Sequence, residues 1–142
     1  MSNQPKLTIL VVDDETRMVR FVKMNLDLEG YLTLEANNGL QALEKVRDHN
    51  PDLVLLDVEM PGMSGLDVAS RLQGRSSTRV IVLTTFARSG YLRRALEAGV
   101  YGYVLKARPA TTLADAVRRV QQGTRVIDPM LAAEAWAEPD PL

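Results

Sequence analysis

Short apolar runs alternate along the chain with segments in which apolar residues recur every three or four positions. The apolar runs read "LTILVV", "YLTLEA", "DLVLLD", "RVIVLTT" and "GYVLK". Their length and their content of β-branched residues are typical of strands that are buried on both faces. After the first run, Met18, Phe21, Val22 and Leu26 follow at helical spacing, and Gly30 is placed to end that helix. The pattern therefore predicts strands and amphipathic helices in alternation.

The same helical spacing returns four more times along the chain. The apolar positions that mark these helices are Leu40, Leu43 and Val46, then Leu66, Ala69 and Leu72, then Tyr91, Leu92, Ala95 and Leu96, and finally Leu113, Ala116, Val117 and Val120. Five strand–helix units in a row predict an α/β protein with a parallel sheet and helices on both faces. Because crossovers between parallel strands are right-handed, few topologies remain. We expect a flavodoxin-like, doubly wound (βα)5 domain with strand order 2-1-3-4-5.

Composition restricts the chemistry that this domain can carry. The chain has 142 residues, 46% of them hydrophobic and 25% charged, with a formal net charge of -1, so no overall basic field favours nucleic acid. There is no cysteine and one histidine, His49, which excludes thiolate metal sites and argues against a histidine metal site. No apolar stretch approaches about 18 residues, and the first residues, "MSNQPK", lack a signal-peptide core. We therefore expect a cytoplasmic protein with no membrane partner.

Polar residues end four of the five predicted strands. These residues are Asp13 and Asp14 after the first strand, Asp57 after the third, Thr84 and Thr85 after the fourth, and Lys106 after the fifth. In open α/β sheets ligands bind beyond the carboxyl ends of the strands, where the strand order reverses. The order 2-1-3-4-5 makes the first and third strands neighbours. Three carboxylates should therefore share one crevice, with a hydroxyl and an ammonium group across from them.

This set of side chains predicts a metal site and a phosphoryl-transfer site in one place. Three clustered carboxylates cannot all stay ionised without a counter-charge, and their hard oxygen atoms suit Mg²⁺. A carboxylate can also attack phosphorus to give an aspartyl phosphate. The Mg²⁺ ion, Lys106 and the Thr84 hydroxyl would then neutralise charge on the transferred group. A plain solvated turn at Asp13 and Asp14 is the alternative, but it leaves the other strand ends unexplained.

Four motifs at these positions closely resemble the receiver domain of two-component response regulators. They are "ILVVDDE", "DLVLLDVEMPGMSGL", "VIVLTTF" and "GYVLK", and the resemblance extends over about residues 7–123. It implies that Asp57 is the phosphoacceptor and that Mg²⁺ is the cofactor. The implied metal ligands are the side chains of Asp13, Asp14 and Asp57 and the carbonyl oxygen of Glu59.

The resemblance also implies how the phosphoryl group is held and sensed. Lys106 and Thr84 would contact it, and the backbone N–H groups of Glu59 and Thr85 would lie beside it. Thr84 and Tyr103 match the switch pair of the family. We expect the Thr84 hydroxyl to turn toward the phosphoryl group and the Tyr103 ring to swing inward. Such a domain is a signalling module and not an enzyme.

The two halves of the chain resemble different branches of the family. "ILVVDDETRMVRFVKMNLDLEGY" is similar to OmpR/PhoB-type receivers, whereas "LTTFARSGYLRRALEAGVYGYVLKA" is similar to NarL/FixJ-type receivers, and to DesR in particular. Ala107 follows Lys106 where proline is common in the family, a departure shared with the NarL/FixJ type. The chain thus has the pattern of a chimera, natural or engineered.

The C-terminal segment indicates which output the domain is expected to control. We assign residues 1–123 to the receiver domain and residues 124–142 to a C-terminal extension, the start of a linker to a helix-turn-helix domain that the sequence does not include. The expected function is to accept a phosphoryl group from a sensor histidine kinase and to control a transcription output by switching conformation and forming a homodimer. DNA would be bound only through the missing domain.

Alternative functions differ in the sequence features that they need. A stand-alone receiver that binds a protein target or relays phosphate remains open, because only sequence beyond Leu142 separates it from the first hypothesis. A haloacid-dehalogenase-type phosphatase needs an aspartate two residues after its nucleophile, and Glu59 stands there. A nucleotide-binding module needs a Gly-rich motif after the first strand, and none follows it.

The arginine distribution also restricts the face through which two copies could pair. The predicted fourth and fifth helices and their flanks carry Arg88, Arg93, Arg94, Arg108, Arg118 and Arg119. A two-fold contact sets a patch against its own copy, so this basic face would repel itself. The first and fifth helices offer a different edge. The first helix mixes Lys23, Asp27 and Glu29 with apolar Met24 and Leu28, and we expect pairing to use that edge.

Overall fold

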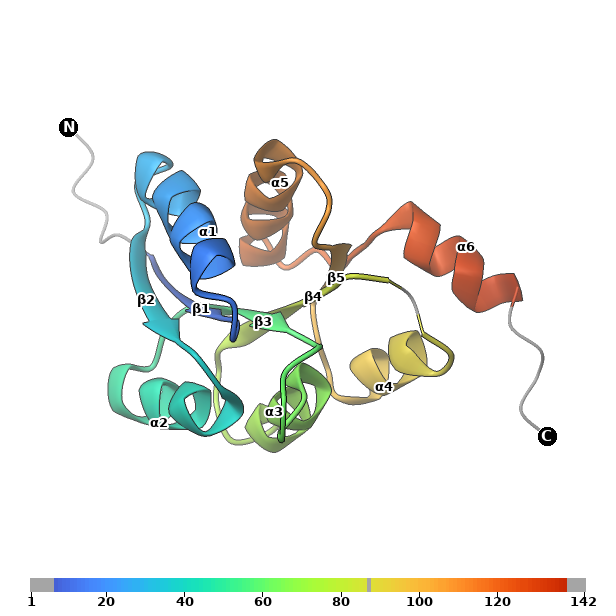
Figure 1. Cartoon of the computed structure of the whole chain (residues 1–142), viewed down its shortest axis with the longest axis horizontal. Coiled ribbons are helices and arrows are strands. Elements are labelled where there is room, and N and C mark those ends of the chain that lie inside the picture. Colours follow the sequence, from blue (N-terminus) through green and yellow to red (C-terminus); the bar gives the residue numbers. More distant parts are fainter. Residues whose placement is uncertain (1–6, 87, 138–142) are drawn as a thin grey trace.

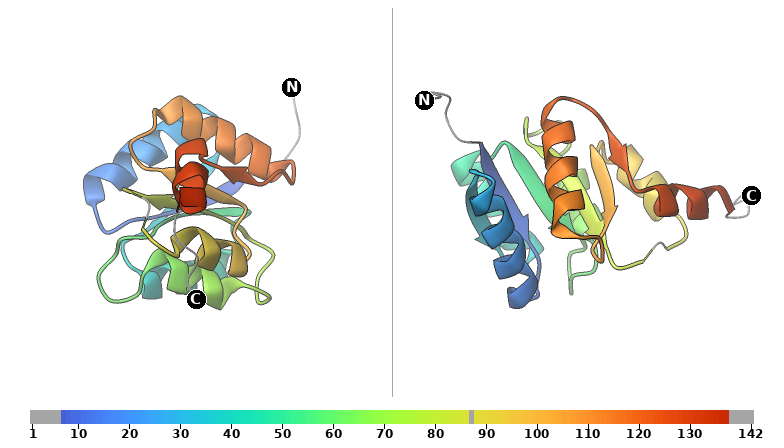
Figure 2. Two further views of the ribbon diagram at one scale, coloured as in Figure 1. Left: turned by 90° about the vertical axis from the view of Figure 1, so that its right-hand side faces the viewer. Right: turned by 90° about the horizontal axis from the view of Figure 1, so that it is seen from above.

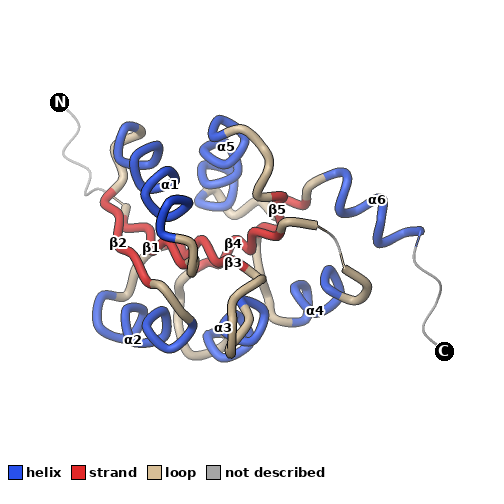
Figure 3. Tube along the Cα trace, viewed as in Figure 1, coloured by secondary structure: helices blue, strands red, loops and turns tan. Residues whose placement is uncertain are grey.

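Six parallel strands form the central layer of the protein (Figures 1 and 3). The structure is a computed structural model and describes residues 7–86 and 88–137. The strands are β1 (Thr8–Val12), β2 (Leu32–Ala36), β3 (Leu53–Asp57), β4 (Arg79–Thr84), β5 (Gly102–Leu105) and β6 (Val126–Ile127). Their order in the sheet is β2-β1-β3-β4-β5-β6. The predicted flavodoxin-like order 2-1-3-4-5 is confirmed, and a sixth strand extends it.

Five helices cover the two faces of the sheet, as the alternating pattern predicts. They are α1 (Thr16–Leu28) and α5 (Ala110–Gln121) on one face, and α2 (Gly39–His49), α3 (Gly65–Leu72) and α4 (Tyr91–Glu97) on the other (Figure 1). Each face has its own buried apolar cluster. Among the described residues, no helix is long and apolar enough to cross a membrane.

Local sequence explains why these elements begin and end where they do. All five residues of β3 are buried, which fits a central strand covered on both faces. In α1 the buried residues Val19, Val22 and Leu26 lie at helical spacing and face the sheet. Helix α3 starts with a capping box, in which Ser64 and Asp67 bond to each other's backbone N–H groups. The start of α3 is thereby fixed just after the end of β3.

The register of the strands sets the polar strand ends side by side. Val12 at the end of β1 pairs with Leu56, one residue before Asp57. On the other side of β3, Asp57 pairs with Leu83, one residue before Thr84. Thr84 in turn pairs with Leu105 of β5. One edge of the sheet therefore brings together residues that are far apart in sequence.

The segment after α5 contributes to the fold in a way that the hydrophobic pattern did not predict. Val126 and Ile127 form the edge strand β6, which pairs with β5. Helix α6 (Pro129–Ala137) follows and contacts α4 and β5. Figure 2 shows α6 at the β5–β6 end of the sheet, opposite β2. Residues 126–137 are thus a strand and a helix where the sequence predicted only the start of a linker; residues 138–142 lie outside the described residues.

Candidate functional site

Three carboxylates meet at the carboxyl ends of β1 and β3, as the strand ends predict. Asp13 and Asp57 are buried, with 2% and 1% of their surface exposed, whereas Asp14 is exposed. One carboxylate oxygen of each lies within 4.8 Å of the others. The Asp13 carboxylate also accepts the backbone N–H of Glu15 at 3.0 Å, which fixes its orientation. Two buried acids and one exposed acid form an acidic pocket that opens to solvent on the Asp14 side.

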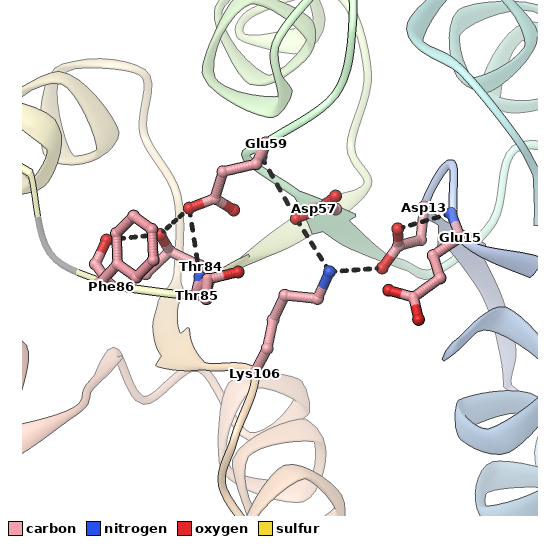
Figure 4. Close-up of polar contacts among 8 residues, drawn as sticks. All are labelled: Asp13, Glu15, Asp57, Glu59, Thr84, Thr85, Phe86 and Lys106. Atoms are coloured by element: carbon pink, nitrogen blue, oxygen red, sulfur yellow. Dashed lines mark hydrogen bonds and ion pairs between the residues drawn. The ribbon is translucent and has the colours of Figure 1, made fainter. Parts of the chain in front are cut away.

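The Lys106 ammonium group lies between the two buried carboxylates (Figure 4). Its Nζ is 2.9 Å from Asp13 Oδ2 and 3.4 Å from Asp57 Oδ1. Burial alone would lower the pKa of Lys106, but its contacts with Asp13 and Asp57 raise that pKa above the usual value. Lys106 therefore remains a cation at neutral pH and is the internal counter-charge of the pocket.

A single lysine does not neutralise the whole acidic pocket. Burial raises the pKa of Asp57 to about 8, with the neighbouring Asp13 charge as the next cause. The pKa of Asp14 is also raised, first by burial and then by its hydrogen bond and charge interaction with Asp13. These shifts indicate that burial and the neighbouring Asp13 carboxylate oppose ionisation of Asp57 and Asp14 more strongly than Lys106 favours it.

The oxygen atoms of this pocket fit a magnesium ion. All side-chain atoms of the cluster that could bind a metal are carboxylate oxygens, the hard ligands that Mg²⁺ prefers. The buried Asp57 Oδ2 has no hydrogen-bond partner among the described residues. A buried carboxylate oxygen that the protein leaves without a donor is suited to bind a cation or to react.

The carboxylate of Glu59 occupies the donors on the other side of Asp57 (Figure 4). Its Oε1 accepts the Thr84 hydroxyl at 2.6 Å and the Thr85 backbone N–H at 3.1 Å. The Thr84 hydroxyl also lies 2.9 Å from the Phe86 carbonyl oxygen, and its one proton serves one acceptor at a time. The Glu59 backbone N–H donates to Asp57 Oδ1 at 3.2 Å.

From the sequence, Glu59 was assigned backbone roles, and the donors that its side chain takes were not predicted. Its signal in the sequence was an acid two residues after Asp57, close enough to reach the end of β4. The direction of a glutamate side chain depends on packing, so the spacing alone did not predict which donors it would take.

Tyr103 is already buried in this structure. Its relative exposure is 1%, and it belongs to the same apolar cluster as Ala95 of α4 and Leu131 of α6. From the sequence, the ring was expected to swing inward when Thr84 moves. The ring is already buried in this conformation, so it does not start from the exposed position that an inward swing requires.

The strand ends that form the acidic pocket, from Asp13 to Lys106, lie within one family match. The family model described as "Response regulator receiver domain" matches residues 9–118. The chain belongs to the response regulator receiver domains. Receiver domains bind Mg²⁺ at an acidic pocket, which agrees with the cluster of Asp13, Asp14 and Asp57.

Two relatives of this receiver domain are named as transcriptional regulatory proteins, and a third is named as a response regulator protein. The chain is 36% identical to transcriptional regulatory protein DesR of Bacillus subtilis over 96% of its own length and 69% of DesR. It is 36% identical to nitrate/nitrite response regulator protein NarL of Escherichia coli, over 96% of this chain and 67% of NarL. It is 41% identical to transcriptional regulatory protein KdpE of Mycobacterium tuberculosis, over 69% of this chain but only 43% of KdpE.

Solved structures of related regulators share the fold of this receiver domain. A LuxR-family two-component response regulator from Aurantimonas sp. SI85-9A1 has 26% identity and a TM-score of 0.86, over 94% of this chain and 97% of that chain. A LuxR-family DNA-binding response regulator from Staphylococcus aureus has 32% identity and a TM-score of 0.77, over 81% of this chain and 98% of that chain. The Aurantimonas structure aligns with 94% of this chain, which is more than the residues 9–118 that the family model matches.

Gly65 allows the start of α3 to pack closely against the end of β3, next to the site. A Cβ atom at Gly65, the first residue of α3, would lie 2.1 Å from the Asp57 carbonyl oxygen. The Gly65 N–H donates to the Val58 carbonyl oxygen at 3.1 Å. This close approach holds the start of α3 against the end of β3.

We expect Gly65→Ala to destabilise the domain by about 3 kcal/mol, because the added methyl group would push the backbone away from Asp57. Gly74→Ala is the matched control. A methyl group added at Gly74 would have no atom within 4 Å, and the φ of Gly74 is +76°, so its replacement should cost only about 1 kcal/mol of backbone strain. Urea unfolding of both variants measures the difference. Equal losses of stability would contradict the assigned close contact.

Proposed function

We propose that this receiver domain accepts a phosphoryl group on Asp57 from a sensor histidine kinase and thereby controls a DNA-binding output outside this sequence. The observation that carries the proposal is the buried Asp57 carboxylate at the end of β3, with Lys106 3.4 Å from one oxygen and no hydrogen-bond partner for the other among the described residues. Receiver domains of response regulators interact with sensor histidine kinases. The names of DesR and KdpE, each a transcriptional regulatory protein, support a transcription output.

The reaction is a phosphoryl transfer between a donor and the Asp57 carboxylate. An Asp57 oxygen forms a bond to phosphorus while the bond from phosphorus to the donor breaks, at nitrogen of a phosphohistidine or at oxygen of acetyl phosphate. Asp13, Asp14, Asp57 and the Glu59 carbonyl would hold Mg²⁺, which supplies charge neutralisation when bound. Lys106 lies on the same pocket and stabilises the added negative charge.

Thr84, Thr85 and Tyr103 would respond to the new phosphoryl group. A phosphoryl group carries a charge of about -1.5 to -2 and strong acceptor oxygens. We propose that it takes the Thr84 hydroxyl and the Thr85 N–H, which Glu59 holds in this structure. The switch then consists of an exchange of acceptors at Thr84, next to the strand that carries the buried Tyr103 ring.

We propose that phosphorylation promotes a homodimer that uses α1. Helix α6 contacts α4 and β5, so it occupies part of the face formed by α4, β5 and α5. On α1, Phe21, Met24 and Leu28 are 51%, 56% and 82% exposed. These three residues are spaced along one side of the helix and form an exposed apolar stripe, which is typical of an interaction surface.

Leu28→Lys is expected to weaken the phosphorylated dimer about tenfold or more, because it places a charge in an apolar contact. Leu96→Lys is the matched control, since Leu96 is an exposed leucine on α4. Sedimentation with and without beryllofluoride measures both dimers. A dimer weakened by Leu96→Lys and unaffected by Leu28→Lys would place the interface on the other face.

The proposal also covers the kind of activity, the cellular location and the ancestry of the domain. We propose that the domain signals and does not turn over a substrate, that it works in the cytoplasm, and that its two halves have mixed ancestry. Matches to DesR, over 96% of the chain, and to KdpE, over 69%, support relatives of both kinds. A stand-alone receiver or phosphorelay module remains the second candidate, and reading the gene on the 3′ side of the Leu142 codon distinguishes the two.

The proposed function is tested by incubation with radiolabelled acetyl phosphate. We expect the protein to become labelled when Mg²⁺ is present and to remain unlabelled when EDTA removes it. Labelling should be unaffected by Asp52→Asn, because Asp52 lies at the opposite end of β3 and bonds to the Thr8 N–H. Equal labelling with and without Mg²⁺ would contradict the metal-dependent mechanism.

A further inference from the structure

An ion pair ties the loop after Lys106 to the start of helix α6. Arg108 Nε and its terminal Nη2 donate to the two carboxylate oxygens of Asp128, at 2.7 Å and 2.8 Å. The Asp128 side chain is 3% exposed, and that of Arg108 is 35% exposed. A bidentate pair with a buried carboxylate is stronger and more specific in geometry than an ordinary surface ion pair.

Asp128 is also the residue that starts α6. Its carboxylate accepts the Met130 N–H at 2.9 Å, and its carbonyl oxygen accepts the Ala132 N–H at 3.0 Å. Pro129 follows it in the first position of the helix, where proline is favoured. The Arg108 guanidinium lowers the pKa of Asp128, so the carboxylate is charged at neutral pH. One side chain thus caps the helix and pairs with Arg108.

The same residue is fixed to the strand that carries the switch tyrosine. The Asp128 N–H donates to the Tyr103 carbonyl oxygen at 2.8 Å. Leu131, in the first turn of α6, is buried in the cluster that contains the Tyr103 ring. Helix α6 therefore contacts the strand of Tyr103 through its backbone and its core residue, and the loop of Lys106 through its cap.

We infer that the Arg108–Asp128 pair couples the state of Asp57 to helix α6. Lys106 contacts Asp13 and Asp57, and Arg108 is only two residues away along a loop. A phosphoryl group on Asp57 adds negative charge that draws Lys106 toward it. Because the pair is already at an optimal distance, a displacement of the loop weakens it and loosens α6. The inference rests on the proposed function, since it needs a phosphoryl group at Asp57.

Coupling of this kind is reciprocal, which separates it from a purely structural role. If a phosphoryl analogue weakens the Arg108–Asp128 pair, then loss of the pair must favour binding of the analogue by the same factor. A variant that merely damages the fold would bind the analogue equally or less tightly. An increase in affinity is therefore the diagnostic result.

Asp128→Asn is the variant that isolates the ion pair. Asparagine keeps the side-chain oxygen that caps α6, since it is as good a cap residue as aspartate, but it removes the charge that holds Arg108. Arg108→Lys tests the pair from the other side, because lysine keeps the charge and loses the bidentate geometry. Asp115→Asn is the control: it breaks the exposed pair of Asp115 with Arg118, at 3.4 Å on α5.

The experiment measures beryllofluoride binding by fluorine NMR and amide hydrogen exchange across residues 129–137, with Mg²⁺ present. In the wild type and in Asp115→Asn, beryllofluoride should speed exchange in α6 several-fold. In Asp128→Asn, exchange in α6 should be fast from the start and change little, while affinity for beryllofluoride rises roughly fivefold or more. Arg108→Lys should act in the same direction.

Two results would overturn the inference, and they differ from failure of the proposed function. One is unchanged or slower exchange in wild-type α6 when beryllofluoride is bound. The other is an affinity in Asp128→Asn that equals or falls below that of the wild type while the variant remains folded. If no fluorine signal of bound beryllofluoride appears in the wild type, the proposed function fails first and the coupling fails with it.

Discussion

Asp57→Asn is expected to unfold at a higher temperature than the wild type in metal-free buffer at about pH 7.5. The fold raises the pKa of Asp57 to about 8 through burial and the nearby Asp13 charge, so ionisation of this group opposes folding. A change of one in pKa corresponds to about 1.4 kcal/mol. Allowing for relaxation and water around the pocket, we expect a gain on the order of 2 kcal/mol.

The pH dependence of this gain follows from the direction of the shift. Because the folded pKa lies above the unfolded value of 3.8, the folded state binds more protons between these two values, and wild-type stability falls as pH rises through this range. The difference between the variant and the wild type should be small near pH 4 and should grow toward pH 8. Thermal unfolding across this range measures it, and a difference that shrinks as pH rises would contradict the account.

Magnesium should reverse the order of stability that the metal-free proteins show. A ligand that binds only the folded state, present at one hundred times its Kd, stabilises it by about 2.7 kcal/mol, which exceeds the gain of about 2 kcal/mol expected for metal-free Asp57→Asn. The wild type should gain this amount, and Asp57→Asn should gain much less, because it lacks the central ligand. Equal stabilisation of both proteins would move the metal away from the cluster of Asp13, Asp14 and Asp57.

Glu59→Gln is expected to be labelled by acetyl phosphate about tenfold faster than the wild type. The Glu59 carboxylate holds the Thr84 hydroxyl and the Thr85 N–H, and its negative charge would oppose an incoming phosphoryl group. Removing about 1.4 kcal/mol from the barrier raises a rate tenfold, and like charges a few ångströms apart in a protein pocket interact by at least about 1 kcal/mol.

Glutamine is the sharpest replacement because it keeps the length and one acceptor oxygen of Glu59 and removes only the charge. Glu44→Gln is the control, since Glu44 lies on α2, away from the acidic pocket. Labelling time courses at a fixed acetyl phosphate concentration give the rates. If Glu59→Gln is labelled no faster than Glu44→Gln, the Glu59 carboxylate does not compete for the donors at Thr84 and Thr85.

The sheet could be predicted from the sequence because its signals are strong and local. β3 is a run of buried apolar residues that ends at Asp57, and α1 carries buried residues at helical spacing. β6 and α6 escaped prediction for a physical reason. A two-residue strand has no period, and the residues of "PMLAAEAWA" are mostly apolar or small all around the helix, so no amphipathic stripe marks it.

Some features of the candidate site could likewise be predicted from the sequence, and others could not. Strand ends placed Asp13, Asp57 and Lys106 together, since parallel register follows from strand order. Side-chain direction does not follow from strand order, so the donors bound by the Glu59 carboxylate were not predicted and the Tyr103 ring was expected to start outside. The Arg108–Asp128 pair joins residues 20 positions apart, and no pattern in the sequence links the two. Such contacts depend on packing that a single sequence does not display.

The most direct test of the account is to locate the phosphoryl group. Protein treated with acetyl phosphate and Mg²⁺ is reduced with borohydride, which traps an aspartyl phosphate, then digested and sequenced by mass spectrometry. We predict that the modification lies at Asp57 and that Asp57→Asn shows no modified peptide although it remains folded. Modification at Asp13, Asp14 or another residue, with Asp57 unchanged, would contradict the assignment of Asp57 as the phosphoacceptor.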